Sequence, residues 1–347
     1  MSDILKSDIN EALSDNNIPW GDLRDSTVLV TGATGLIGGA LVHILSAANE
    51  KHKLNMLLLA NGRSAAKGEA LVNNHKAVFI RGDIRKPETI ADAAEKIDYI
   101  FHCAAITKSA DMVAKPADVA LTAVDGTRNM LELALAKRCK SFEYLSSMEI
   151  YGQCEKREVR ESDLGYMDLS NPRCSYPVSK RFCEVMCLAY FWQYGLPVKT
   201  VRLAQTFGAG TPKDDARVFV QFARKAMAGE DLELHTEGRS RGNYCYTSDT
   251  VRGLLTILLK GTAGEAYNIA NPAASMTIRD MAELVASDVC GGRIKAIVNI
   301  PENVAKRGYA PDVGYILNID KVSSLGWTPK HGLAEMYRRM LASWQGQ

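Results

Sequence analysis

The sequence predicts an α/β fold in which a doubly wound parallel sheet is joined to a smaller C-terminal α/β lobe. Short apolar segments alternate with amphipathic segments of helical spacing through much of the chain. Apolar strands separated by helices are typical of parallel sheets that are covered on both faces. From about residue 207 the loops lengthen and Gly and Pro recur, which favours a separate lobe.

The composition is that of a globular protein with a full core. The chain has 347 residues, 46% of them hydrophobic, and a formal net charge of +2. This balance argues against nucleic acid or a membrane surface as the main partner. The N-terminus lacks signal-peptide regions and no apolar run is long enough to span a membrane, so we expect a cytoplasmic protein. The eight cysteines have no zinc-ribbon spacing, so we expect no metal site.

The expected elements follow in order along the chain. Residues 1–25 form an N-terminal helical extension, residues 26–206 a dinucleotide-binding region, and residues 207–347 a mainly substrate-binding lobe whose segments interleave with that region. The helical spacing of Ile4, Leu5, Ile9 and Leu13 predicts a short amphipathic helix packed on the main body. Apolar runs predict strands at 55–60, 77–81, 97–103, 141–146, 199–203 and 231–235. Helical patterns lie at 40–49, 87–95, 113–118, 122–138, 176–194 and 216–228. In the helix at 176–194, Cys183 and Cys187 share a face and are expected in the core.

A glycine-rich turn at 31–38 lies between an apolar strand and a helix. Glycines at 32, 35 and 38 let the backbone turn sharply and approach a pyrophosphate. The following helix start offers free N–H groups and a partial positive charge to that anion. This context predicts a Rossmann-type dinucleotide site made by Gly32, Thr34, Gly35, Leu36, Ile37 and Gly38.

A tyrosine and a lysine four residues apart predict a catalytic pair. Tyr176 and Lys180 share one face of a helix. A lysine ammonium close to a phenol lowers the pKa of the tyrosine, which makes Tyr176 usable as a general base near neutral pH. Ser147 follows a strand at the ligand edge of the sheet, where its hydroxyl could hold a substrate oxygen.

Taken together, these motifs resemble the extended short-chain dehydrogenase/reductase family, the NAD-dependent nucleotide-sugar epimerases and dehydratases. The resemblance runs from about residue 26 to 345 and rests on TGATGLIGG (31–39), GDIR (82–85), HCAA (102–105), SSMEIYG (146–152), YPVSK (176–180), RLAQTFGAG (202–210) and LGWTP (325–329). It implies an enzyme that oxidises a nucleotide-diphosphate sugar at C4 with bound NAD. It also implies a homodimer formed through the helix that carries Tyr176.

The resemblance assigns further site residues. Besides Tyr176 and Lys180, the cofactor contacts that it implies are Asp83 and Ile84 at the adenine, and His102, Cys103, Ala104 and Ala105 at the end of a strand. The substrate contacts that it implies, besides Ser147, are Thr107, Arg173, Gln205, Arg217, Arg239 and Arg241.

The segment around residue 149 bears on the reaction type. Glu149 occupies the place of a catalytic glutamate found in 4,6-dehydratases and in UDP-glucuronate decarboxylases, although a salt-bridged or solvent-facing carboxylate is an equal alternative. Dehydratases usually carry an aspartate before it as the acid, whereas Met148 cannot donate a proton. Arg173 and Arg181 match the R-x-x-Y-x-x-x-K-R pattern of the decarboxylases.

A glycine replaces an arginine of the family in the later substrate loop. The arginine that usually grips the diphosphate aligns with Gly242, and Arg239 and Arg241 could substitute for it, because diphosphate binding needs a guanidinium fork more than one position. Decarboxylases also use that arginine. We therefore expect a 4-epimerase-type reaction, with decarboxylase-like or 4,6-dehydratase-like reactions as alternatives.

The end of the second strand leaves the cofactor choice open. An acidic residue there usually binds the adenine ribose of NAD, but this strand ends in LANGRS. Arg63 could accept a 2′-phosphate and thus NADP. Enzymes of this family that oxidise and re-reduce one substrate keep NAD bound, so we expect NAD, with an NADP-dependent net reductase as an alternative function.

Overall fold

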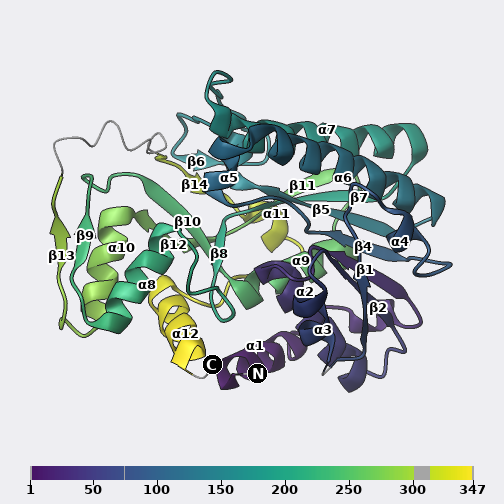
Figure 1. The fold of residues 1–347 in the computed structure, drawn as a ribbon, viewed down its shortest axis with the longest axis horizontal. Helices are drawn as coiled ribbons and strands as arrows, with labels where there is room; N and C mark the ends of the chain where they lie inside the picture. Colours follow the sequence, from purple (N-terminus) through teal and green to yellow (C-terminus); the bar gives the residue numbers. More distant parts are fainter. Residues whose placement is uncertain (1, 74, 301–312, 346–347) are drawn as a thin grey trace.

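Seven parallel strands form the central sheet, in the order β11-β7-β5-β4-β1-β2-β3 (Figure 1). The computed structural model describes residues 2–73, 75–300 and 313–345. The strands are β1 (Thr27–Thr31), β2 (Leu57–Gly62), β3 (Ala77–Arg81), β4 (Tyr99–His102), β5 (Ser141–Ser147), β7 (Val198–Leu203) and β11 (Glu265–Ile269).

The direction in which strands are added reverses between β1 and β4. The chain runs outward from β1 to β3, then returns to β4 and runs outward the other way. Thr31 and His102, the last residues of these two strands, are register partners. In open parallel sheets, ligands bind beyond the carboxyl ends of the strands at such a switch point.

Helices cover both faces of the sheet (Figure 1). The alternating residues Val28 and Val30 point to a core shared with α2 and α9, whereas Leu29 points to a core shared with α6 and α7. The helices of the sheet region are α2 (Leu36–Lys51), α3 (Ala65–Val72), α4 (Glu88–Ala91), α5 (Ser109–Ala114), α6 (Pro116–Ala136), α7 (Ser175–Tyr194) and α9 (Thr247–Lys260).

A second lobe has its own sheets and core (Figure 1). It contains the three-stranded sheet β12-β10-β8 and the pair β13-β9. Its elements are β8 (Gln205–Phe207), α8 (Val218–Ala228), β9 (Leu232–Leu234), β10 (Arg241–Tyr246), β12 (Asn271–Thr277), α10 (Ile278–Leu284), the π-helical turn Val285–Val289, β13 (Ala296–Val298) and α12 (Leu333–Gln345). A separate pair joins β6 (Glu158–Val159) to β14 (Ile316–Leu317), which precedes α11 (Asp320–Ser323). Because β11 and α9 belong to the first sheet region, the later part of the chain interleaves with the earlier part.

All six predicted strands are present with small shifts at their ends, but three predicted helices are wrong in extent. The helix expected at 87–95 is only Glu88–Ala91. The segments expected as helices at 113–118 and 122–138 divide differently, because α5 ends at Ala114 and α6 runs from Pro116 to Ala136. Proline has no backbone N–H and disfavours helical backbone in the preceding residue, so it starts a helix and separates it from the one before.

The predicted N-terminal helix is present as α1 (Asp3–Leu13), capped by the Ser2 side chain. Its buried residues Ile9, Ala12 and Leu13 belong to the main core. The predicted core cysteines Cys183 and Cys187 are fully buried. Within the described part of the chain, no helix is both long and apolar enough to cross a membrane.

Candidate active site

The glycine turn after β1 approaches its neighbours too closely for other residues. Gly32 has a φ of +65°, and a Cβ there would lie 2.8 Å from Cα of Ala104. A Cβ on Gly38 would lie 2.4 Å from the carbonyl oxygen of Gly32. Gly35 is the exposed N-cap of α2 and provides no side-chain cap, so the first N–H groups of that helix stay available to an anion. This geometry fits the pyrophosphate of a dinucleotide.

The rest of the predicted turn contributes backbone and apolar surface. Thr34, Leu36 and Ile37 are half-buried around the start of α2. A Cβ on Gly62 at the end of β2 would lie 3.0 Å from Cγ2 of Thr34. The structure therefore brings the end of β2 against the glycine turn.

A buried polar chain beneath this turn joins the predicted cofactor residue His102 to Thr31 and Thr127, two residues that sequence reasoning did not assign to the site. Thr31 Oγ1 lies 2.9 Å from Nδ1 of His102 and accepts a hydrogen bond from the Ala104 N–H at 3.3 Å. Nε2 of His102 lies 3.3 Å from Oγ1 of Thr127 on α6. Burial lowers the pKa of His102 to about 3, so the imidazole is neutral. The hydroxyl residue just before the first glycine was the signal available in the sequence.

The predicted cofactor residues at the rim are placed along the strand ends. Cys103, Ala104 and Ala105 are half-buried directly after β4, while Thr107 is exposed. Arg63 is exposed directly after β2. All of these residues therefore lie at the carboxyl ends of the strands on either side of the switch point.

Beyond β3, two predicted adenine contacts have protein partners. The Asp83 carboxylate accepts a hydrogen bond from Nη2 of Arg85 at 2.9 Å, and this pairing lowers its pKa. Ile84 packs against Gly126, where a Cβ would come within 2.3 Å of Cδ1 of the isoleucine. The side chain of Asn61 donates to the carbonyls of Ile80 and Gly82, so it braces β2 against β3.

Tyr176, Ser147 and Lys180 come together between α7 and β5. Tyr176 lies in the first turn of α7 with 7% of its surface exposed, and the Ser147 hydroxyl is close enough to lower its pKa. The Ser147 Oγ also accepts the backbone N–H of Glu149 at 3.2 Å, which fixes its orientation. Nζ of Lys180 donates to the Leu145 carbonyl at 2.6 Å and lies 4.6 Å from the centroid of the Tyr144 ring.

The predicted lowering of the Tyr176 pKa by Lys180 is wrong. Burial raises the pKa of Tyr176, and the negative charge of Glu149 raises it further. The hydrogen bond with Ser147 and the charges of Arg173 and Arg217 act in the opposite direction but do not outweigh burial. Shared helical spacing predicted that the Lys180 ammonium lies near the phenol, but the ammonium donates to the Leu145 carbonyl of β5 instead.

Glu149 forms a two-pronged ion pair with Arg173. Nη1 of the arginine lies 2.7 Å from Oε2, and Nη2 lies 3.1 Å from Oε1. Both side chains are about one-third exposed, with 29% for Arg173 and 33% for Glu149. The salt-bridged alternative considered for this carboxylate is therefore the arrangement found. Met148 beside it is buried with 6% exposure, so it offers an apolar side chain and no proton.

The other predicted arginines differ in how they are held. Nη2 of Arg217 pairs with Asp215 at 2.6 Å, yet its charge still reaches Tyr176. Arg241 donates to the Ser275 carbonyl at 2.8 Å within the second lobe, and Arg239 is exposed. Gln205 is half-buried at the start of β8. Of this set, the structure brings Arg217 to the tyrosine.

Two positions of the decarboxylase pattern have structural explanations. Arg181 donates to the carbonyls of Ile150 and Gly165, so it supports the loop that carries Glu149. A Cβ on Gly242 would lie 2.1 Å from Oη of Tyr244, so an arginine fits there only if that ring moves.

Comparison with known proteins identifies the family. The family model described as NAD dependent epimerase/dehydratase family matches residues 28–270. The chain belongs to this family. The resemblance drawn from the motifs is therefore confirmed.

Curated relatives of this family member include UDP-glucuronic acid decarboxylases. UDP-glucuronic acid decarboxylase 6 of Arabidopsis thaliana is 31% identical over 316 residues, which cover 89% of this chain and 85% of the relative. UDP-glucuronic acid decarboxylase 1 of Danio rerio is 28% identical over 311 residues, which cover 89% of this chain and 70% of the relative. Membership of the family makes the protein an NAD-dependent enzyme of the epimerase/dehydratase type, with NAD as its cofactor.

Solved structures share the fold of this family member. A UDP-glucose 4-epimerase of Thermotoga maritima, solved with UDP-glucose, has a TM-score of 0.78 at 24% identity and covers 92% of this chain and 98% of its own. A dTDP-glucose 4,6-dehydratase of Streptomyces venezuelae, solved with NAD, has a TM-score of 0.76 at 23% identity and covers 92% and 97%. The predicted Rossmann-type fold is thus confirmed.

Proposed function

We propose that this family member oxidises C4 of a nucleotide-diphosphate hexuronic acid and removes its carboxyl group as carbon dioxide. The observation that carries the proposal is the Arg173–Glu149 pair beside Tyr176, together with the buried Met148. The sequence relatives named as UDP-glucuronic acid decarboxylases support the same reaction and point to a uridine nucleotide.

Tyr176 is the base of the oxidation in this proposal. Its phenolate removes the proton of the C4 hydroxyl as a hydride leaves C4, and Ser147 holds the C4 oxygen. When bound, NAD supplies the hydride acceptor and a positive charge that favours the phenolate. Gly32, Gly35 and Gly38 would hold its pyrophosphate, and Lys180 its nicotinamide ribose.

Loss of the carboxyl group then needs no further acid. The C4 ketone lies β to the carboxylate, so the bond from C5 to the carboxyl carbon breaks and its electron pair becomes the enolate of that ketone. Carbon dioxide leaves and a proton adds at C5, and the hydride taken up by the cofactor would then return to C4 as Tyr176 gives its proton back to the C4 oxygen. Elimination of water would instead need an acid for the departing hydroxyl, and the apolar Met148 occupies that position.

The guanidinium of Arg173 can bind the carboxylate of the substrate. Its guanidinium is partly exposed and already binds one carboxylate, that of Glu149, in the forked geometry that suits such groups. A hexuronic acid can share this guanidinium with Glu149. Neutral hexoses offer no such charge, so the pair favours a uronic acid substrate.

Gly242 favours a second candidate, the 4-epimerase expected from the sequence. The glycine lies under Tyr244 and leaves the lobe without the arginine that decarboxylases use near the substrate. In an epimerase, the C4 ketone is re-reduced on its other face, and no bond at C5 breaks.

A homodimer is part of the proposal. Phe182 and Val185 on α7 are each 54% exposed, Trp192 is 71% exposed, and Leu121 on the adjacent α6 is 53% exposed. Large apolar side chains gathered on one pair of helices are typical of a protein interface. The resemblance implied a four-helix contact at this helix.

Mass spectrometry of nucleotide sugars after incubation tests the reaction. UDP-glucuronate should lose carbon dioxide, and UDP-glucose and dTDP-glucose should keep their mass. An unchanged mass with altered chromatographic retention would favour the 4-epimerase, and loss of water would contradict both candidates. Tyr176→Phe, which keeps the ring but removes the base, is the matched control.

A further inference from the structure

The N-terminal helix α1 joins the two lobes. It contacts α2 and α9 of the sheet region and α12 of the second lobe, and Figure 1 shows it beside the end of α12. Besides its apolar contacts, α1 makes hydrogen bonds and ion pairs through its polar side. These contacts lead from Asp8 to the turn that faces the dinucleotide site.

Asp8 is the centre of this polar side. It is 3% exposed, although it carries a carboxyl group. Its Oδ2 accepts the hydroxyl of Tyr246 at 2.7 Å, and its Oδ1 accepts Nη1 of Arg339 at 2.7 Å. The carboxyl group of α1 thus binds both the last residue of β10 and a side chain of α12.

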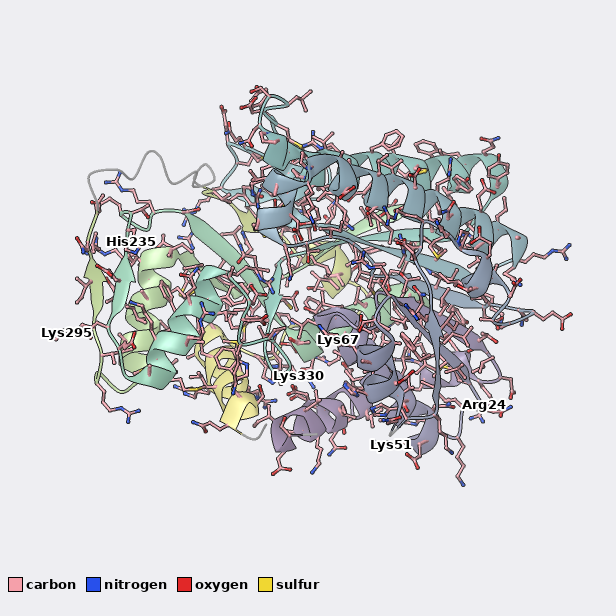
Figure 2. The ribbon with its side chains drawn as sticks, viewed as in Figure 1. Arg24, Lys51, Lys67, His235, Lys295 and Lys330 are labelled. Atoms are coloured by element: carbon pink, nitrogen blue, oxygen red, sulfur yellow. The ribbon has the colours of Figure 1, made fainter. Side chains whose placement is uncertain are left out.

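A second clamp lies one helical turn further along α1. Nε2 of His331 lies 3.2 Å from Glu11 and its Nδ1 lies 3.1 Å from Asp249 on α9. Lys330, labelled in Figure 2, adds a contact with Glu11 at 3.7 Å.

The same three residues, Glu11, Asp249 and His331, are close enough to hold a metal ion. However, the two carboxylates bind opposite nitrogens of one imidazole ring. The Oδ2 of Asp249 also accepts the backbone N–H groups of Lys330 and His331. The cluster is therefore an ion-pair clamp, which leaves Asp8 and Tyr246 as the contacts that lead toward the site.

Tyr246 supports the turn at Gly208–Thr211. The Ala209 N–H donates to its hydroxyl at 3.5 Å, and a Cβ on Gly208 would lie 2.3 Å from Cε2 of its ring. The turn is closed by the hydroxyl of Thr211, which accepts the Gly208 N–H at 2.9 Å. The turn therefore packs directly on the ring of Tyr246.

The supported turn faces the dinucleotide site. A Cβ on Gly210 would lie 3.6 Å from Cδ1 of Leu36, the first residue of the helix that follows the glycine-rich turn. The turn also continues directly from β8, which begins with Gln205. A shift of Tyr246 would therefore move backbone that borders the cofactor site.

We propose that α1 is a positioning element of the active site, in which Asp8 holds Tyr246 and Tyr246 holds the Gly208–Thr211 turn against Leu36. The helix sets how closely the second lobe approaches the bound cofactor. Asp8 is a positioning residue, since it lies on α1 and acts through Tyr246. The inference holds for either candidate reaction, because both use the same cofactor site.

Binding of NAD to four variants of the full chain tests this role. Asp8→Ala and Tyr246→Phe remove the two ends of the contact, whereas Asp8→Asn keeps an acceptor for the tyrosine hydroxyl. Asp3→Asn is the matched control, because the Asp3 side chain is 95% exposed on the same helix. Titration calorimetry gives the affinity for NAD, and steady-state kinetics give KM and kcat separately.

We expect roughly tenfold weaker NAD binding in Asp8→Ala and Tyr246→Phe, the ratio that one lost hydrogen bond of this kind produces. KM should rise more than kcat falls, and Asp8→Asn should recover most of the affinity. If Asp8→Ala fails to fold, Tyr246→Phe decides, because it keeps the ring. Unchanged NAD affinity and KM, with only a lower melting temperature, would overturn the proposal and leave α1 a purely structural helix.

Discussion

Arg173 donates to Glu149 through Nη1 and Nη2, at 2.7 and 3.1 Å, one helical turn before Tyr176, the proposed base. The pair places a negative and a positive charge beside the same phenol. Glu149 raises the pKa of Tyr176, and Arg173 lowers it. The balance between the two therefore tunes the base, a role that the sequence pattern had assigned to Lys180.

Removing the charge of Glu149 should move the pH profile. In Glu149→Gln the main electrostatic influence that raises the pKa of Tyr176 is lost and Arg173 keeps its charge. The rising limb of kcat/KM against pH should shift to lower pH by roughly one unit. Steady-state rates across the pH range give the pH at the midpoint of this limb. That midpoint does not depend on any change in the maximal rate.

Glu155→Gln is the control for this shift. Glu155 is exposed on the same loop, and its loss changes the net charge equally. Its profile should match that of the unchanged protein. If the rising limb of Glu149→Gln had the same midpoint pH as that of the parent protein, Glu149 would not influence the pKa of Tyr176.

Glu143 is a buried carboxyl group whose removal should stabilise the fold. It is fully buried on β5, and within the described residues neither of its oxygens has a hydrogen-bond partner. Burial raises its pKa well above the ordinary value, so the folded state loses stability as pH rises above about 4.5. Glu143→Leu should gain roughly 1–3 kcal/mol at neutral pH.

Urea unfolding at several pH values checks this gain. Glu143→Leu should also flatten the fall in stability between about pH 5 and 7, where the unfolded carboxyl group is ionised. Glu143→Gln is the comparison, because it removes the charge but leaves a polar group without partners. A Glu143→Leu protein that is less stable than the parent would show that the carboxyl group has a structural role.

His331 should make the attachment of α1 depend on pH. Burial lowers the pKa of this histidine, but the hydrogen bonds that its ring donates to Asp249 and Glu11 outweigh burial and raise the pKa to about 9. A folded pKa above the unfolded value of 6.5 gives stability that is complete below pH 6.5 and lost as pH rises through about 9.

Hydrogen exchange along α1 measures this loosening. Amide protection in α1, corrected for the intrinsic effect of pH on exchange, should fall between pH 6.5 and 9 in the parent. His331→Gln should show weaker protection that changes little over that range. Equal pH dependence in both proteins would exclude the histidine as its source.

The apolar surface of α7 predicts a change of assembly. Val185→Asp places a charge among the exposed side chains of Phe182 and Leu121, and a dimer formed there should dissociate. Met227→Asp on α8 is the control, because Met227 is 43% exposed in the other lobe. Light scattering gives the mass of each variant, and a monomeric parent protein would refute the dimer.

Patterns in the sequence predicted the parts of the structure that are determined by residues close together in the chain. The glycine turn was predictable because only glycine fits beside Ala104 at position 32. The break between α5 and α6 lies at Pro116, whose effect is local and was overlooked. The direction of the Lys180 ammonium was not predictable, since helical spacing fixes a shared face but not where a long side chain ends.

Contacts between segments that are far apart in the sequence could not be predicted from such patterns. Asp8 and Tyr246 are 238 residues apart in the sequence, and nothing near either residue indicates the other. A salt-bridged Glu149 was weighed against a catalytic one, but its partner Arg173 was not foreseen, because each residue also matched a catalytic pattern. Distances in the folded chain were needed to decide between them.

The most direct test of Tyr176 as the base that removes the C4 hydroxyl proton during hydride transfer is a single-turnover absorbance measurement. The protein loaded with NAD is mixed with UDP-glucuronate, and the absorbance of reduced nicotinamide is followed in the parent and in Tyr176→Phe. We expect the reduced cofactor to appear before or together with carbon dioxide in the parent, and to stay absent in the variant. Release of carbon dioxide or formation of an epimer by Tyr176→Phe at the parental rate would contradict the account.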